Sequence, residues 1–207
     1  MADRDIVVIG ASAGGIAALS AIVRRWPRDL PASVFVVIHT APESPGYIAD
    51  ILTGLGSLSA RYATDGEHFA PGVIYLAPAD YHLLIEPPRT VRVLRGPREN
   101  NARPAIDPLF RSAALGFGRR VIGVVLSGGL DDGTAGLSGI KMCGGTTVIQ
   151  DPDDAEVSSM PRSAERNVSI DHCAPAGALG PLLEELVTAP SSGSHGHGDP
   201  RQLGAGR

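Results

Sequence analysis

Apolar residues recur along the chain in short runs separated by polar and glycine-rich segments. The clearest runs are rich in Val, Ile and Leu and lie at residues 5–10 (DIVVIG), 33–39 (SVFVVIH), 120–126 (RVIGVVL) and 146–149 (TTVI). A continuous apolar run is typical of a strand that is buried on both faces of a parallel sheet. Segments with a helical pattern of Ala, Leu and Ile follow at residues 15–23, 47–55 and 132–143. This alternation predicts an α/β fold that is doubly wound, with a mostly parallel sheet and helices on both faces.

The middle of the chain departs from the alternation. Apolar runs at residues 72–77, 81–86 and 90–95 are separated only by short turn segments, PAD and PPR. Closely spaced strands with such turns form hairpins, so this part predicts a small antiparallel hairpin region.

The remaining elements are helices and a tail. Helices are predicted at residues 104–115, with Pro104 in the first turn, and at 161–166 and 175–187. Residues 188–207 are polar, rich in Gly and Ser and without periodicity. We therefore expect one folded domain over residues 1–187, followed by a disordered tail over residues 188–207.

Composition narrows the class of protein. A chain of 207 residues can form one full α/β core. The net charge of −4 gives no electrostatic reason to expect binding to nucleic acid or to an anionic membrane. The acidic start is unlike a signal peptide, and no apolar run approaches the roughly 20 residues that span a bilayer. Only Cys143 and Cys173 are present, without a CxxC pair, so neither a disulfide framework nor a zinc site is predicted. We expect a cytoplasmic protein.

The first strand–turn–helix has the pattern GxSxG at residues 10–14 (GASAG). Small neighbours allow a sharp turn that lifts the Ser12 hydroxyl clear of the sheet, and the following helix directs its N–H groups at a developing oxyanion. A glycine-rich junction of this kind also binds nucleotide phosphates. However, Ser12 stands where GxGxxG has its second glycine, and the second strand ends in no acidic residue. This turn alone leaves a hydrolase and a nucleotide-binding oxidoreductase both open.

Two further segments place polar side chains at the same edge of the sheet. His39 ends the second strand, and Asp131 and Asp132 follow the strand at residues 120–126. Open α/β sheets form their sites at the carboxyl ends of the strands. A lone His is more often a core or surface residue, and Asp often caps a helix. Together with Ser12, however, these residues can form a Ser–His–Asp triad, and position leaves Asp131 and Asp132 both open as its acid.

With these segments in view, residues 5–186 resemble the catalytic domain of the CheB family of protein-glutamate methylesterases. GASAGG resembles the family's GAS-T/S-GG turn, VVIHTAPESPGY its strand and QHMP loop, and SGGLDDGTAG its TGMG-x-DG-x-x-G segment. Further matched segments lie at residues 65–67, 77–82, 103–107 and 160–162. The order Ser, His, Asp along the chain differs from that of ordinary α/β-hydrolases, in which the acid precedes the histidine.

The resemblance implies roles for individual residues. It makes Ser12 the nucleophile, His39 the general base and Asp132, rather than Asp131, the acid of a catalytic triad. The oxyanion would be held by backbone N–H groups at Ala13 and Gly14.

Other positions receive less direct roles. Gly129, Met160 and Arg162 are expected to line the substrate cleft. We expect structural ion pairs or caps at His82, Arg103 and Asp107. The two histidines of the tail, His195 and His197, are expected to be solvated.

The implied activity is hydrolysis of glutamate methyl esters on chemoreceptor-type proteins, with release of methanol and without a metal or an organic cofactor. The family also deamidates some receptor glutamines. The partner would be a methyl-accepting chemoreceptor, through which alone the protein would meet a membrane. A non-catalytic chemosensory interaction module and, less in keeping with the motifs, a nucleotide-binding oxidoreductase remain alternatives.

The sequence departs from the family pattern at three positions near the site. Ala13 stands where the family has Thr or Ser, Gly129 where it has Met, and Leu130 where it has Gly. The receiver domain that usually precedes this domain in the family is also not in the sequence. Control by its phosphorylation is therefore not implied, and we expect the purified chain to be constitutively active.

Overall fold

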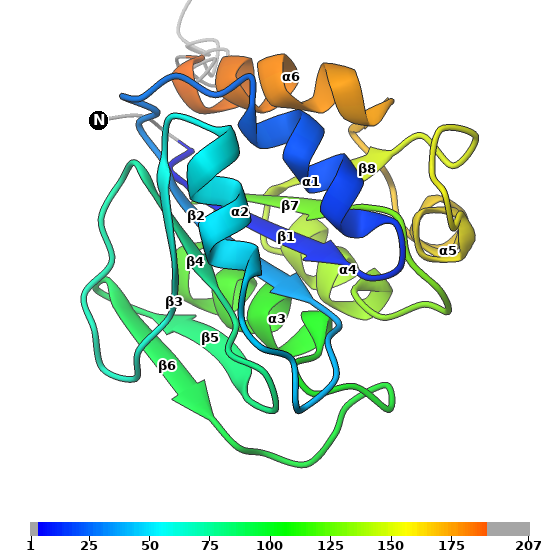
Figure 1. Ribbon diagram of the computed structural model, residues 1–207. Helices are drawn as coiled ribbons and strands as arrows, with labels where there is room; N and C mark the ends of the chain where they lie inside the picture. Colours follow the sequence, from blue (N-terminus) through cyan, green and yellow to red (C-terminus); the bar gives the residue numbers. More distant parts are fainter. Residues whose placement is uncertain (1–3, 190–207) are drawn as a thin grey trace, which may run out of the picture.

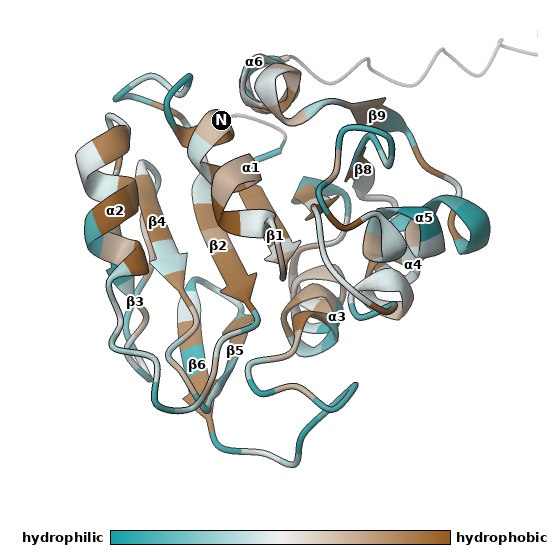
Figure 2. Cartoon of the chain, turned by 45° about the vertical axis from the view of Figure 1, so that its right-hand side comes forward, coloured by the Kyte–Doolittle hydropathy of each residue, from teal (hydrophilic) through white to brown (hydrophobic). Residues whose placement is uncertain are grey.

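The continuous apolar runs form the centre of one parallel sheet. The computed structural model describes residues 4–189, and the sheet has seven strands in the order β3-β4-β2-β1-β7-β8-β9. All of its strand pairs are parallel. The strands are β1 (Ile6–Ala11), β2 (Ser33–Ile38), β3 (Ser59–Tyr62), β4 (Val73–Leu76), β7 (Val121–Val125), β8 (Thr146–Gln150) and β9 (His172–Ala174). Strand β2, buried along its whole length, is brown over most of its length in Figure 2.

Helices cover both faces of this sheet, which confirms the doubly wound fold (Figure 1). Alternate residues of β1 enter two separate hydrophobic clusters, one on each face. The first cluster includes side chains of α1 (Gly15–Val23), α2 (Ile48–Leu55) and α6 (Ala176–Thr188). The second includes side chains of α3 (Ile106–Phe117), α4 (Thr134–Met142) and α5 (Ser159–Asn167). No helix between residues 4 and 189 has the length and apolar character needed to cross a membrane.

The hairpin region is smaller than the apolar pattern predicts. Strands β5 (His82–Glu86) and β6 (Thr90–Leu94) form an antiparallel pair that packs on α3. The preceding run, expected in the same region, instead pairs in parallel with β2 and forms β4. Strands β3 and β9 were not predicted, because they are short edge strands whose residues are partly exposed and form no continuous apolar run.

Two helices, α3 and α4, begin later in the chain than the sequence predicts, because loops that carry site residues precede them. Helix α3 begins at Ile106, so Pro104 lies before the helix rather than in its first turn. Helix α4 begins at Thr134, and a short 3₁₀ turn (Gly118–Arg120) precedes β7. Asp131 and Asp132 therefore lie in the loop between β7 and α4. Helix α6 ends at Thr188, and the rest of the predicted tail lies outside the described residues.

The strand register brings the ends of three strands together. Ala11, the last residue of β1, pairs with Ile38 of β2, and Gly10 pairs with Val125 of β7. The His39 N–H donates to the Ala11 carbonyl over 3.1 Å and so extends the pairing by one residue. The prediction that the first two strands lie side by side is confirmed, and all three following loops begin at one edge.

Candidate active site

The turn after β1 holds Ser12 by its backbone. The Ser12 N–H donates to the Ser127 carbonyl, and the Gly15 N–H donates to the Ser12 carbonyl, each over 2.9 Å. Gly14 has a φ of +75°, in the left-handed region that glycine adopts without steric cost. The Ser127 hydroxyl donates to the Ala13 carbonyl over 2.7 Å. The small residues of GxSxG therefore allow a turn that is bound to the loop after β7.

Two backbone donors of this turn remain available. The N–H groups of Ala13 and Gly14 form no hydrogen bond with any other residue in the described range 4–189. Both residues line a hollow that also contains Ser12 and His39. Unpaired N–H groups beside a nucleophile can stabilise an oxyanion, which is the role expected of them.

His39 and Asp132 form a short polar contact at the site. Nε2 of His39 lies 2.7 Å from Oδ2 of Asp132, which is 1% exposed. The Asp132 carboxylate also accepts the backbone N–H groups of Ile106 and Asp107, over 2.7 and 3.2 Å. These two N–H groups belong to the first turn of α3, where free donors and the helix dipole favour an anion. The N-terminus of α3 thus binds the carboxylate that holds the imidazole.

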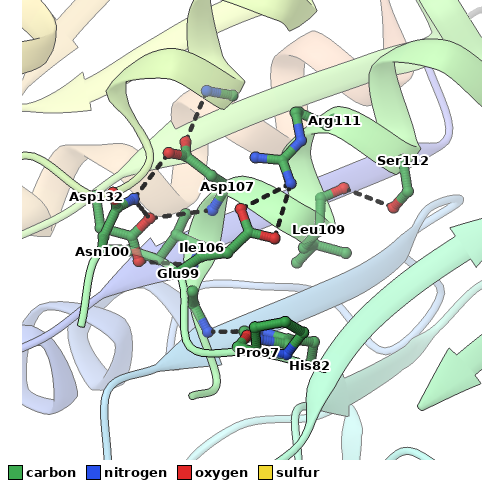
Figure 3. Close-up of polar contacts among 12 residues, drawn as sticks. His82, Pro97, Glu99, Asn100, Ile106, Asp107, Leu109, Arg111, Ser112 and Asp132 are labelled. Atoms are coloured by element: carbon green, nitrogen blue, oxygen red, sulfur yellow. Dashed lines mark hydrogen bonds and ion pairs between the residues drawn. The ribbon is translucent and has the colours of Figure 1, made fainter. Parts of the chain in front are cut away.

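A side-chain amide completes the environment of Asp132. Nδ2 of Asn100 donates to Oδ1 of Asp132 over 2.7 Å, and Figure 3 shows the carboxylate between Asn100 and the start of α3. Burial alone would raise the pKa of Asp132, but hydrogen bonds from His39, the Ile106 N–H and Asn100 outweigh it. The pKa consequently lies below its ordinary value of 3.8. Asp132 is therefore a carboxylate at neutral pH.

The contact between Ser12 and His39 is more open. Because Nε2 of His39 faces Asp132, Nδ1 is the ring nitrogen left for the serine. Within the described part of the chain the Ser12 hydroxyl forms no hydrogen bond, so the expected bond to His39 is not made. Both residues nevertheless line the same two hollows. Such bonds are often long in ligand-free sites and shorten when substrate binds.

The two hollows meet at the pair formed by Ser12 and His39. One has a volume of about 430 Å³ and the other of about 670 Å³. Gly129, for which a place in the substrate cleft is expected, lines the smaller hollow. Its neighbour Leu130 also lines it, 71% exposed and with a φ of +65°, which is uncommon for a residue other than glycine. The family pattern has glycine at this position.

Met160 and Arg162 line neither hollow. Met160 is fully buried, and a Cβ added to Gly128 would lie 2.1 Å from its sulfur. Met160 therefore packs against the loop after β7 instead of facing the cleft. Arg162 donates to Asp153 over 2.6 Å at the surface. The structure thus corrects the expected cleft positions of both residues, because α5 turns one into the core and the other toward solvent.

Asp131 and Asp132 are separated by their surroundings. Asp131 is exposed, and its backbone carbonyl accepts the Thr134 N–H over 3.1 Å. No side chain caps α4, whose N-cap is Gly133, so of the two possibilities, a helix cap or an exposed side chain, Asp131 has the second. Of the two acidic residues, Asp132 alone contacts His39.

The other matched polar residues form contacts around the loop at residues 95–104 and at the start of α4. Arg103 donates to Asp80 over 2.6 and 2.8 Å. His82 lies 2.8 Å from the Pro97 carbonyl through Nε2 and accepts a backbone N–H through Nδ1. Asp107 accepts the Gly136 N–H over 2.7 Å. Arg103 thus forms an ion pair and Asp107 accepts an N–H group in the first turn of α4, whereas His82 forms no ion pair and contacts two backbone groups.

Asn100 is the site residue that sequence reasoning missed. Its signal was the tandem Asn100–Asn101 pair, since Asn is one of the few side chains that tolerates a positive φ. Both residues have a positive φ, 50° and 60°.

Among residues 4–189, no cluster of three or more His, Cys, Asp or Glu side chains is placed to hold a metal ion.

Comparisons with known proteins agree with this architecture. The family model for the CheB methylesterase domain matches residues 7–183. A relative from Leptospira interrogans is 40% identical over 168 residues, covering 81% of this chain and 87% of the relative. The protein-glutamate methylesterase/protein-glutamine glutaminase 2 of Anaeromyxobacter dehalogenans is 37% identical, covering 88% of this chain and 53% of its own length. The chain thus spans about half of that relative.

A solved structure is similar over almost all of the described residues. The crystal structure of the Thermotoga maritima CheB methylesterase catalytic domain aligns with a TM-score of 0.86 and 34% sequence identity. The alignment covers 89% of this chain and 99% of that domain. With a family model that spans most of the sequence and the same fold at this identity, the chain belongs to the CheB methylesterase family.

Proposed function

We propose that this chain is a serine esterase that hydrolyses glutamate methyl esters on chemoreceptor-type proteins and releases methanol. The observation that supports this most is the His39–Asp132 pair, with 2.7 Å between Nε2 and Oδ2, beside Ser12 at one edge of the sheet. The curated relatives named above include a protein-glutamate methylesterase/protein-glutamine glutaminase. The proposal combines that family membership with the chemistry that the three side chains can perform.

In the proposed reaction the Ser12 hydroxyl attacks the ester carbonyl, and Nδ1 of His39 takes its proton. Asp132 fixes the ring by accepting from Nε2 and stabilises the imidazolium that forms. The N–H groups of Ala13 and Gly14 hold the oxyanion of the tetrahedral intermediate. The loss of one such donor typically lowers the rate by about 10²–10³.

The intermediate then collapses as His39 returns the proton to the departing methoxide, so that methanol leaves and an acyl-Ser12 ester remains. Water attacks this ester while His39 acts as base again, which regenerates the serine and a glutamate carboxylate. The same route with ammonia as leaving group would convert a glutamine amide into glutamate. We propose this second activity because the names of the relatives pair the two.

The proposed partner is a methyl-accepting chemoreceptor or a related chemosensory protein. We propose that the chain acts on it in the cytoplasm and meets the membrane only through it. A non-catalytic chemosensory module would need no buried carboxylate hydrogen-bonded to an imidazole, and no observation favours it. The turn at Ser12 likewise lacks the glycine that a dinucleotide-binding loop requires.

The test is release of labelled methanol from methylated receptor signalling helices by the purified chain. We expect release by the wild type and a loss of roughly 10⁴-fold or more in Ser12→Ala, as for other triad nucleophiles. Ser20→Ala is the matched control, because Ser20 lies on α1 and its hydroxyl bonds only the Ile16 carbonyl among residues 4–189. Equal release by Ser12→Ala and wild type would overturn the assignment of Ser12 as the nucleophile. Activity on a small ester without any activity on methylated receptors would overturn the proposed substrate.

A further inference from the structure

A second buried carboxylate, that of Asp107, lies next to the triad carboxylate of Asp132. Asp132 is 1% exposed and Asp107, in the first turn of α3, is 6% exposed. Nδ2 of Asn100 lies 2.7 Å from Oδ1 of Asp132 and 2.9 Å from Oδ2 of Asp107. An amide nitrogen has two N–H groups, so each carboxylate can accept one of them. Figure 3 shows Asn100 in this bridging position.

The chemical type of the bridge matters. The carboxylates of Asp107 and Asp132 are close enough to share one amide nitrogen. Two negative charges this near repel each other, more strongly in a buried site than in water. An amide offers a donor to each without adding a charge. A lysine or arginine here would pair with Asp132 and compete with His39 for it. Asn100 thus relieves the repulsion and leaves the ion pair with the imidazole to His39.

The backbone around Asn100 is shaped to present this amide. Glu99 and Ala102 exchange backbone hydrogen bonds of 3.2 and 2.8 Å across the turn. Asn100 and Asn101, the two central residues, both have a positive φ, which is the pattern of a type I′ turn. The Glu99 carboxylate accepts from Arg111 of α3 over 2.8 and 3.0 Å. The turn is therefore attached to the same helix whose N-terminus binds Asp132.

We propose, on the basis of the function proposed above, that Asn100 is a positioning residue for the triad. Oδ1 of Asp132 is held by Asn100 and the Asp107 N–H, while Oδ2 accepts from His39 and the Ile106 N–H. With Oδ1 held from two sides, the carboxylate cannot rotate about its bond to Cβ. Oδ2 then stays directed at His39, which leaves Nδ1 of His39 available to Ser12.

The test compares two neighbouring asparagines of one turn. Glycine adopts a positive φ readily, so Asn100→Gly and Asn101→Gly both preserve the turn, but only the first removes the bridging amide. On a small activated ester we expect kcat to fall about 10- to 100-fold in Asn100→Gly, the range for a hydrogen bond to a charged group, with KM unchanged. Asn101→Gly should stay near the wild-type kcat. A small ester removes receptor recognition from the comparison.

A second readout does not depend on turnover. The proton on Nε2 of His39, hydrogen-bonded to Asp132, should give a low-field proton NMR resonance in the wild type. We expect this resonance to broaden or move upfield in Asn100→Gly and to be unchanged in Asn101→Gly. If the wild type hydrolyses no ester, the proposed function fails, yet this resonance still reports on Asn100.

A further variant covers the case in which Asn100→Gly does not fold. Asn100→Asp has nearly the same shape and tolerates a positive φ, but it replaces the donor by a third carboxylate. We expect a larger loss of kcat than in Asn100→Gly. Wild-type kcat in either Asn100 variant would overturn the proposal. So would equal losses in Asn100→Gly and Asn101→Gly, because they would show that only the turn matters.

Discussion

The two ends of the triad are built in opposite ways. At the acid end, the two oxygens of Asp132 accept four hydrogen bonds, from His39, Asn100 and the N–H groups of Ile106 and Asp107. At the nucleophile end, the Ser12 hydroxyl accepts and donates none within residues 4–189, and the turn is held by backbone contacts.

The difference follows from when each charge exists. The Asp132 carboxylate is charged in every state of the proposed cycle, so permanent donors stabilise it throughout. The oxyanion exists only while substrate reacts. Donors reserved for it must stay unpaired in the free protein, as the N–H groups of Ala13 and Gly14 are. The acid end is therefore complete without substrate, and the nucleophile end is completed by it.

The largest expected effect concerns the acid end. Asp132→Asn should preserve the fold but favour the wrong imidazole tautomer, and the comparable change in serine proteases lowers turnover by roughly 10⁴. Asp131→Asn should barely change turnover, because the Asp131 side chain is exposed. Both variants are measured on a small activated ester. A large loss in Asp131→Asn with little loss in Asp132→Asn would reverse the assignment.

A smaller effect tests the packing of the nucleophile end. In Gly128→Ala the new Cβ would lie 2.1 Å from the Met160 sulfur and 2.9 Å from the Ser12 Cβ. Overpacking of this kind typically destabilises a protein by about 1–3 kcal/mol. We expect a lower melting temperature and a lower kcat, since the Ser12 side chain must shift.

Gly129→Ala is the matched control for stability. A Cβ at Gly129 would have no atom within 4 Å, so its melting temperature should remain that of the wild type. Equal melting temperatures for both alanine variants would contradict this prediction. They would show that Met160 and Ser12 can move away from a new Cβ at residue 128 without loss of stability.

The smallest effect separates the two carboxylates of the acid end by pH. Burial raises the pKa of Asp107 above its ordinary 3.8, so its contribution to stability is present below that value and is lost as pH rises through the folded pKa. The pKa of Asp132 is lowered, so its contribution is present above 3.8 and is lost as pH falls through the folded pKa. Asp107→Asn and Asp132→Asn remove one titration each.

Urea unfolding of both variants and the wild type from acid to neutral pH measures the two contributions. The stability difference between wild type and Asp107→Asn should shrink as pH rises, whereas the difference for Asp132→Asn should grow. Slopes of the same sign would contradict the assignment of Asp132 as the carboxylate stabilised in its charged form.

Local patterns in the sequence were enough for the central architecture. The continuous apolar runs predicted β1, β2, β7 and β8, and the GxSxG turn placed Ser12 at the edge where His39 follows the next strand. These inferences succeed because strand burial and turn geometry depend on residues close together in the chain. The exposed edge strands β3 and β9 escaped, since short strands with one open side have no such pattern.

The acid end, in contrast, depended on tertiary structure. Position along the chain left Asp131 and Asp132 equivalent, and a resemblance to the family was needed to choose between them. The structure separates them because the N-terminus of α3 and the amide of Asn100, both distant in sequence, pack against Asp132 alone. The burial of Met160 also depended on tertiary structure, because the packing of α5 on the sheet decides which side chains of the helix face inward. A sequence shows which side chains can reach an edge of a sheet, but long-range packing decides which partners they meet.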